Sequence, residues 1–383
     1  MNSQYGNSLT VHTGGKPVKL AYAESDDSIY VISTDFSARW PSHILRNGSA
    51  SLTVNDSEIT GFPALVTSPD DKEMIIGMFT NKYGSDYVSR YFSNPARYIR
   101  ISMNGSKETA GSNYYTWLEE EFDSVADHYD NHIFGNRINM LLRKRSLEMM
   151  RKYSTRAARI IEIGCGTGAE TLELLKDGHE VFALDISGRM LDNVREKANK
   201  DGYGSMLTTV KMRASDIGDI LPTVGENAFD LGYSTYGALN CEPEIEKLPE
   251  VLSRLIKPAG YFVAGVYNKY CVSETLANIV SLKLQRLFWR FRNPISEGRS
   301  RFCIDVYSFS INEFMKIFGD HFERVETAGV PVILPPSNFN RIINGVSRKF
   351  DSLSTLDRLV SERWPWKYLG DHFLVALKNS KAA

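Results

Sequence analysis

The clearest indication of the fold comes from Arg159-Ile160-Ile161-Glu162-Ile163-Gly164-Cys165-Gly166-Thr167-Gly168-Ala169-Glu170. An apolar run ends in a cluster of glycines, and a helix-forming sequence follows it. Glycines here let the backbone turn tightly and bring its N–H groups close to a ligand at the positive end of a helix. We therefore predict a buried strand, a nucleotide-binding turn and a helix, which together form the first unit of a parallel α/β sheet.

The sequence on either side of this turn alternates between predicted strands and helices. Such alternation is typical of βαβ units and a parallel sheet. Further strands are predicted at 180–184, 261–266, 321–325 and 372–377, and helices at 170–176, 189–199 and 245–255.

Three acidic residues indicate which nucleotide the turn binds. Asp185 closes the second strand, where a carboxylate accepts hydrogen bonds from ribose hydroxyls. Glu162 precedes the first glycine by two positions and can contact the cationic amino group of an amino-acid moiety, which a dinucleotide lacks. Asp216, after the third strand, can accept from an adenine amino group. These residues favour S-adenosylmethionine, although the spacing Gly164-x-Gly166-x-x-Ala169 also fits a nicotinamide dinucleotide.

With these residues in place, the chain from about Phe122 onward resembles the class I S-adenosylmethionine-dependent methyltransferases. The resemblance implies a Rossmann-like, doubly wound α/β sheet whose last strand is antiparallel. It also implies that a Tyr of the helical stretch 122–130 folds over the cofactor. The implied cofactor-binding residues are Tyr129, Glu162, Gly164, Gly166, Gly168, Asp185, Ile186, Asp216, Ile217 and Ser234.

The substrate side of the predicted site carries fewer signals. Methyl transfer needs positioning, a dry site and, for a hydroxyl acceptor, a general base. The loop Ser234–Gly237 lacks the Asp/Asn-Pro-Pro-Tyr/Phe motif of enzymes that methylate nucleic-acid bases or glutamine side chains, which favours a small-molecule or lipid-like acceptor. We assign Tyr236 to substrate positioning and His372 to the base. The alternative for His372 is a structural histidine at the start of a strand.

The first hundred residues contain short predicted strands separated by turn signals, and we expect a small all-β barrel. The stretches Thr10–Leu20, Trp40–Asn47 and Tyr83–Phe92 resemble the split-barrel flavin and deazaflavin nitroreductase-like family, in which a basic stretch that clamps phosphate is reduced here to Thr13-Gly14-Gly15-Lys16. The resemblance implies FMN or deazaflavin binding, and alternatives are a barrel for dimerisation or substrate presentation, or a binder of another small ligand.

These patterns predict two domains. The barrel covers residues 1–108 and the methyltransferase domain covers 109–383, with a linker at 103–113, a helical cap at 113–153 and a lid insertion at 269–305. Within the insertion, Leu284, Leu287, Phe288 and Phe291 recur at helical spacing beside the basic residues Lys283, Arg286 and Arg290. This segment predicts either contact with an anionic membrane or lipid substrate, or a lid helix whose apolar face lies on the core.

Composition narrows the function further. The 383 residues carry 45 Lys and Arg against 46 Asp and Glu, a formal net charge of −1, so the charge excess of a nucleic-acid binder is missing. The four cysteines are widely spaced and suggest neither a metal site nor a disulfide framework. The polar stretch Met1–Thr10 and the lack of a long apolar run predict a cytoplasmic protein.

We therefore expect a cytoplasmic enzyme that transfers a methyl group from S-adenosylmethionine to a small-molecule or lipid-like acceptor. The barrel resemblance adds the expectation of a homodimer. The alternative is a flavin- or deazaflavin-dependent oxidoreductase whose C-terminal domain senses a nucleotide.

Overall fold

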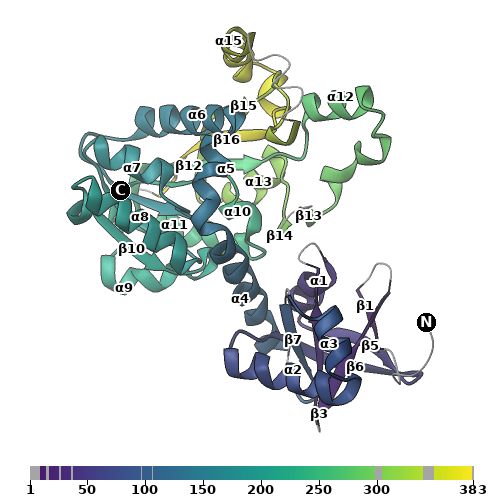
Figure 1. Ribbon diagram of the computed structural model, residues 1–383. Helices are drawn as coiled ribbons and strands as arrows, with labels where there is room; N and C mark the ends of the chain where they lie inside the picture. Colours follow the sequence, from purple (N-terminus) through teal and green to yellow (C-terminus); the bar gives the residue numbers. More distant parts are fainter. Residues whose placement is uncertain are drawn as a thin grey trace. The chain divides into compact units, whose positions relative to one another are not determined.

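The computed structural model describes residues 9–13, 17–25, 27–35, 38–95, 97–105, 107–297, 304–339 and 349–381 (Figure 1). The chain forms two compact units: one spans 1–121 and 296–305, the other 122–295 and 306–383. Within the described residues, no helix is long and apolar enough to cross a membrane.

The first unit is an antiparallel sheet of seven strands in the order β2-β1-β5-β6-β7-β4-β3. The sheet is nearly closed, consistent with the expected barrel. Its strands are β1 (Leu9–His12), β2 (Val18–Leu20), β3 (Tyr22–Ser25), β4 (Ser28–Ser33), β5 (Ala50–Val54), β6 (Ser57–Leu65) and β7 (Arg97–Ser102), and its helices are α1 (Trp40–Asn47), α2 (Pro69–Tyr83) and α3 (Ser85–Tyr91). Alternate strand residues such as Val31, Leu52 and Ile99 are fully buried inside it.

The segment expected as a linker, 103–113, is largely helical instead. Helix α4 (Lys107–Val125) begins at its centre, because the buried residues Tyr114, Trp117 and Leu118 recur at helical spacing directly after it. Inside α4, the Glu121 carboxylate accepts a hydrogen bond of 2.8 Å from Arg97 Nε of β7. This contact assigns the first part of α4 to the barrel unit, whose boundary lies after Glu121 rather than at the predicted residue 108.

The second unit is a mixed sheet in the order β10-β9-β8-β11-β12-β16-β15. From β10 to β12 the strands are parallel, while β16, the last in sequence, runs antiparallel to both of its neighbours. This confirms the predicted doubly wound sheet and its antiparallel last strand. The strands are β8 (Arg159–Ile163), β9 (Glu180–Asp185), β10 (Leu207–Lys211), β11 (Phe229–Ser234), β12 (Ile256–Tyr267), β15 (Phe322–Val330) and β16 (His372–Asn379).

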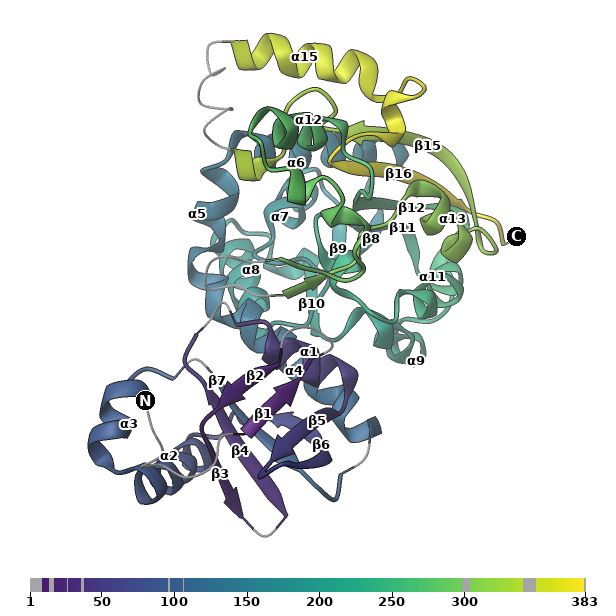
Figure 2. The ribbon, with the colours of Figure 1, turned by 90° about the vertical axis from the view of Figure 1, so that its right-hand side faces the viewer.

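Both faces of this sheet are buried, as Figure 2 shows by the helices on either side of β8, β9 and β11. Ile160 packs into the core on one face and Ile161 into the core on the other, so the buried strand is continuously apolar. The first face is covered by α6 (Arg137–Tyr153), α7 (Ala169–Lys176) and α8 (Gly188–Lys200), and the second by η3 (Ala214–Ile220), α11 (Leu248–Leu255) and α13 (Ile311–Phe318).

Short elements complete the unit. They are η1 (Ala126–His128), α5 (Tyr129–Phe134), η2 (Gly204–Met206), α9 (Leu221–Val224), α10 (Ala238–Cys241), η4 (Ile245–Lys247), η7 (Ser337–Phe339), α15 (Phe350–Ser361) and η9 (Trp366–Tyr368).

The predicted lid insertion has an internal structure that the spacing of its apolar residues did not predict. It contains α12 (Val272–Val280), η5 (Leu284–Arg286), η6 (Trp289–Phe291), β13 (Ile295–Glu297) and β14 (Ile304–Val306), and residues 298–303 lie outside the described part. A single helix over 284–291 does not form, and Leu284, Phe288 and Phe291 are exposed, so a lid helix with its apolar face on the core is wrong. Leu282, with a φ of 55°, turns the backbone away from α12 before this stretch.

Candidate functional site

The glycine turn joins β8 to α7 with the conformation that glycine alone adopts easily. Gly164, Gly166 and Gly168 have φ values of 76°, 52° and 82°. A Cβ on Gly164 would lie 2.2 Å from the Ala238 side chain, and one on Gly168 would lie 2.2 Å from the Val194 side chain. Packing therefore also prevents Gly164 and Gly168 from being replaced by a larger residue.

Asp185 lies at the carboxyl end of β9, beside this turn. One carboxylate oxygen accepts a hydrogen bond of 2.8 Å from Gly166 N, and the other accepts one of 2.9 Å from Ser187 N. Burial raises the pKa of Asp185 to about 6, although the backbone donors partly offset it. Each oxygen has further acceptor capacity, so the carboxylate can bind a pair of neighbouring hydroxyls. Ile186, the next residue, is half-buried.

Glu162 lies on β8 beneath the turn and is almost fully buried. Thr171 Oγ1, in the first part of α7, donates a hydrogen bond of 2.5 Å to its carboxylate, and Tyr233 of β11 lies next to it. Burial raises the pKa of Glu162 to about 8, against the opposing effect of these hydroxyls. A cation beside Glu162 would supply the positive charge that compensates a buried carboxylate.

The residues predicted for the adenine side lie on η3, after β10. Ile217 is fully buried in the core of one face of the sheet. The Asp216 side chain is 39% exposed and pairs with Arg213 at 3.2 Å. Asp216 thus occupies a different element from Asp185, and its contact with an adenine stays a prediction.

A helical cap lies against the glycine turn, as the resemblance implied. Asp130 of α5 accepts hydrogen bonds from Thr167 Oγ1 at 2.6 Å and from Lys197 Nζ of α8 at 2.5 Å, and Lys197 also donates to the Thr167 carbonyl at 2.9 Å. Tyr129, one position earlier, has a ring carbon 3.6 Å from where a Gly166 Cβ would lie. The cap is therefore fastened to the turn by side chains, of which Lys197 and Asp130 were not singled out in the sequence.

The loop after β11 connects the glycine turn to a second group of side chains. Ser234 is buried and donates a hydrogen bond of 2.8 Å to the carbonyl of Ile163, so its hydroxyl is engaged by the end of β8. Tyr236, with a φ of 54°, donates its hydroxyl to the carbonyl of Leu142 on α6. Burial raises the pKa of Tyr236, which keeps the phenol protonated.

His372 lies beside this ring. The centroids of the His372 and Tyr236 rings are 5.6 Å apart, and Tyr267 approaches the imidazole edge-on from β12 at 5.4 Å. The structure thus brings together the two residues that the sequence assigned to substrate positioning and base.

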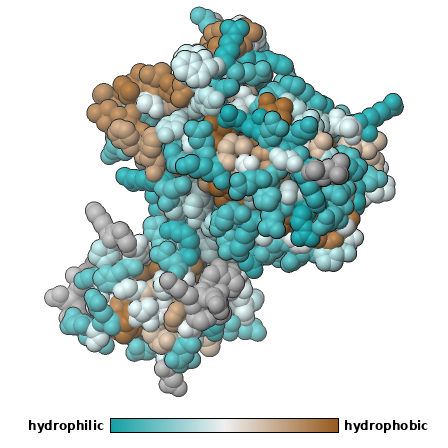
Figure 3. All heavy atoms as spheres, turned by 180° about the vertical axis from the view of Figure 1, so that it is seen from behind, coloured by the Kyte–Doolittle hydropathy of each residue, from teal (hydrophilic) through white to brown (hydrophobic). Residues whose placement is uncertain are grey.

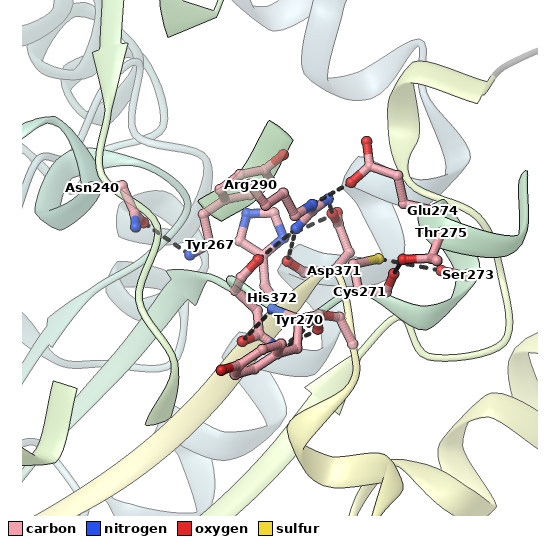
Figure 4. A network of polar contacts seen from close by, with 12 residues as sticks. Asn240, Tyr267, Tyr270, Cys271, Ser273, Glu274, Thr275, Arg290, Asp371 and His372 are labelled. Carbon is pink, nitrogen blue, oxygen red and sulfur yellow. Dashed lines mark hydrogen bonds and ion pairs between the residues drawn. The ribbon is translucent and has the colours of Figure 1, made fainter. Parts of the chain in front are cut away.

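Asp371 holds the imidazole from its other side, at 3.2 Å between Oδ2 and Nδ1 (Figure 4). Burial would raise the pKa of Asp371, but the charges of His372 and Arg290 outweigh it and hold the pKa at about 2. Because Asp371 is ionised, its carboxylate can accept a hydrogen bond from Nδ1–H of the imidazole.

Arg290 connects the insertion to this dyad. It is buried, donates to the carboxylates of Glu274 and Asp371, and lies over the Tyr267 ring at 4.0 Å (Figure 4). Its Nη1 also donates to the Asn268 carbonyl at 2.8 Å. The sequence grouped Arg290 with Lys283 and Arg286 as basic residues beside the apolar ones. The structure instead buries Arg290 between Glu274 of α12 and Asp371, which lies just before β16.

Metal-ligating side chains do not cluster in the described part of the chain: no group of three or more His, Cys, Asp or Glu is positioned to hold an ion there. Cys165, Cys241 and Cys271 are buried. Cys303 and the Gly14–Lys16 stretch, on which the flavin resemblance partly rests, lie outside the described residues.

Comparison with known proteins agrees with this geometry. Residues 161–264, from β8 to β12, match the family model described as a methyltransferase domain. The chain is 20% identical over 156 residues to the tRNA 5-carboxymethoxyuridine methyltransferase of Escherichia coli, covering 40% of this chain and 58% of that protein. It is 27% identical over 135 residues to the ubiquinone biosynthesis O-methyltransferase of Vibrio campbellii, covering 34% and 52%. The alignments thus span little more than half of each relative.

Among solved structures, the Burkholderia thailandensis 1,6-didemethyltoxoflavin-N1-methyltransferase with bound S-adenosylhomocysteine is similar at a TM-score of 0.44 and 15% identity, covering 70% of this chain and 89% of that one. The glycine turn, Asp185 and Glu162 all lie in or beside the span that the family model matches. Residues 161–264, which lie in the second unit, are thus similar to a methyltransferase domain.

Proposed function

We propose that this protein transfers a methyl group from S-adenosylmethionine to a hydroxyl of a small-molecule or amphipathic acceptor. The observation that carries the proposal is the carboxylate of Asp185, held by Gly166 N and Ser187 N at the end of the strand next to the glycine turn. The match of residues 161–264 to a methyltransferase domain supports it.

The residues present fit this cofactor. Asp185 offers two carboxylate oxygens to the ribose hydroxyls, and the buried Glu162 offers a negative charge to the amino group of the methionine moiety. Tyr129 and the cap close over the turn. When bound, S-adenosylmethionine supplies a methyl group on a positively charged sulfur.

The chain itself then has to orient the acceptor, exclude water and accept a proton. His372 Nε2 accepts the proton of the acceptor hydroxyl, since Asp371 holds Nδ1. The rings of Tyr236 and Tyr267 flank the imidazole and restrict the directions from which an acceptor can approach it. A hydroxyl acceptor is favoured because it loses its proton on O-methylation, and an imidazole base can accept that proton. One aligned relative is by name an O-methyltransferase.

Calorimetric titration with S-adenosylmethionine, S-adenosylhomocysteine, NADH and FMN tests the cofactor. We expect micromolar binding of the two adenosyl compounds and none of NADH. A phenol panel with radiolabelled S-adenosylmethionine then tests for O-methyl products. Binding of NADH or FMN in the absence of S-adenosylmethionine binding would overturn the proposal and favour the oxidoreductase alternative.

FMN or deazaflavin binding by the barrel, a homodimer and a cytoplasmic location stay predictions. The FMN titration tests the first of these, and sedimentation equilibrium tests the second. We also propose that nucleic acid is not the acceptor, because the chain carries no excess of basic residues.

A further inference from the structure

The insertion after β12 carries a row of exposed apolar side chains, which we call the apolar crest. Figure 3 shows it as the brown patch at the upper left of that view. Its most exposed members are Leu282 at 84%, Val280 at 82% and Phe288 at 73%. The crest comprises Leu276, Ile279, Val280, Leu282, Leu284, Phe288 and Phe291.

Helix α12 buries polar side chains and exposes apolar ones, which is the opposite of the usual arrangement in a surface helix. On α12 the buried side chains include Ser273, Glu274 and Asn278, while Leu276 and Val280 face solvent. Large apolar side chains grouped on a surface mark a site of interaction, because a monomer in water gains nothing from exposing them.

The charged residues of the segment that carries the crest are all basic. Between Thr275 and Pro294 the sequence contains four basic residues and no acidic one, in a chain whose net charge is −1. Arg290 is buried in the dyad network, whereas Lys283 and Arg292 are exposed and Arg286 is half-buried. Apolar and aromatic side chains bordered by Lys and Arg are the pattern of segments that lie in the interface of an anionic membrane.

A second copy of the chain fits this surface less well than a lipid layer does. A two-fold contact through the crest would bring Lys283 and Arg286 of one copy towards the same residues of the other, and like charges facing each other oppose association. An anionic lipid surface instead accepts the apolar side chains and attracts the basic ones.

We propose that the apolar crest is a docking surface for anionic lipid membranes. The same segment contains Arg290, which donates to Asp371, so docking takes place next to the elements that orient His372. The link to an amphipathic acceptor taken from the membrane rests on the proposed function; the docking surface itself does not.

Co-sedimentation with vesicles tests the surface. We expect the protein to bind vesicles of phosphatidylcholine and phosphatidylglycerol, and to bind pure phosphatidylcholine far more weakly. The double variant Lys283→Gln/Arg286→Gln should weaken anionic-vesicle binding about 30-fold, since each basic residue near such a surface contributes ~1 kcal/mol. The double variant Leu282→Glu/Phe288→Glu should abolish it.

Met140→Glu is the matched control, because Met140 is a helical residue that is 42% exposed outside the crest, and its vesicle binding should equal that of the parent. Thermal unfolding by circular dichroism shows that each variant folds. No vesicle binding by the parent, equal loss in Met140→Glu, or self-association that the crest variants abolish would each overturn the proposal. None of these results depends on methyl transfer, so they are distinguishable from a failure of the proposed function.

Discussion

Arg290 Nη2 donates a hydrogen bond of 2.5 Å to Asp371 Oδ1, although the two residues are 81 positions apart in the sequence. Both side chains are almost fully buried, and Glu274 pairs with the same guanidinium. The insertion and the strand that carries His372 are thus joined by one cation between two carboxylates. A buried carboxylate without a compensating cation lowers the free energy of unfolding.

Replacing Arg290 with methionine should lower the free energy of unfolding by about 3–5 kcal/mol, because Glu274 and Asp371 lose their shared buried cation. Urea unfolding followed by circular dichroism measures this. Arg286→Met is the control, since Arg286 is only half-buried, and it should change stability by no more than about 0.5 kcal/mol. Equal losses in the two variants would show that the Arg290 network does not stabilise the fold.

His372→Gln should lower kcat by about 10²- to 10⁴-fold, the usual contribution of a positioned general base. The affinity for S-adenosylmethionine should not change, because the imidazole lies among Tyr236, Tyr267 and Asp371 rather than at the glycine turn. Single-turnover rates and calorimetry separate the two quantities. His321→Gln serves as the control, and an unchanged kcat in His372→Gln would make this residue a structural histidine.

Glu162 should make stability fall with rising pH. Its pKa is raised to about 8 in the folded state, so between its unfolded value near 4.5 and pH 8 the folded chain retains a proton that the unfolded chain has lost. This stabilising contribution is complete below pH 4.5 and disappears as the pH rises through 8. Urea unfolding of Glu162→Gln against the parent should show a smaller fall in stability over this range.

The same carboxyl should release a proton when a cationic ligand binds beside it. Near pH 7 the free protein holds Glu162 protonated, and an ammonium group favours the ionised form. Titrations with S-adenosylmethionine in buffers of different ionisation enthalpy should reveal this release in the parent. Its presence to the same extent in Glu162→Gln would assign the proton to another group.

Asp185→Ala should weaken S-adenosylmethionine binding by about 1–3 kcal/mol, the cost of losing hydrogen bonds to the ribose. Calorimetry measures the change directly. Asp192→Ala is the matched control on α8, where the carboxylate is 69% exposed and pairs with Arg195. Unchanged affinity in Asp185→Ala would show that the ribose is held elsewhere.

The sequence predicted those parts of the site whose residues lie in short motifs directly after a strand. Gly164 and Gly168 follow an apolar strand, and the end of the next strand in the sheet places Asp185 beside them. A parallel sheet brings the carboxyl ends of its strands to one edge, so a motif after one strand and an acid after the next meet there.

Other features depend on partners distant in sequence. The burial of Arg290 follows from Glu274 and Asp371, and no periodicity in residues 283–291 indicates it. The helical spacing of the apolar residues in 284–291 predicted a single helix. The structure instead has a turn at Leu282, followed by two short 3₁₀ segments. Likewise, the polar composition of 103–113 concealed the start of α4, because the buried residues that stabilise this helix come later.

The position of β16 between β12 and β15 sets an order of assembly during synthesis. Both neighbours leave the ribosome before β16 does, and each pairs with β16 rather than with the other. Until residues 372–379 emerge, β12 presents an open edge of unpaired backbone groups, the kind of edge to which other chains add. The nascent chain is therefore most prone to aggregation just before Asp371 and His372 are synthesised. The segment that pairs with the open edge of β12 is also the one that carries these two residues.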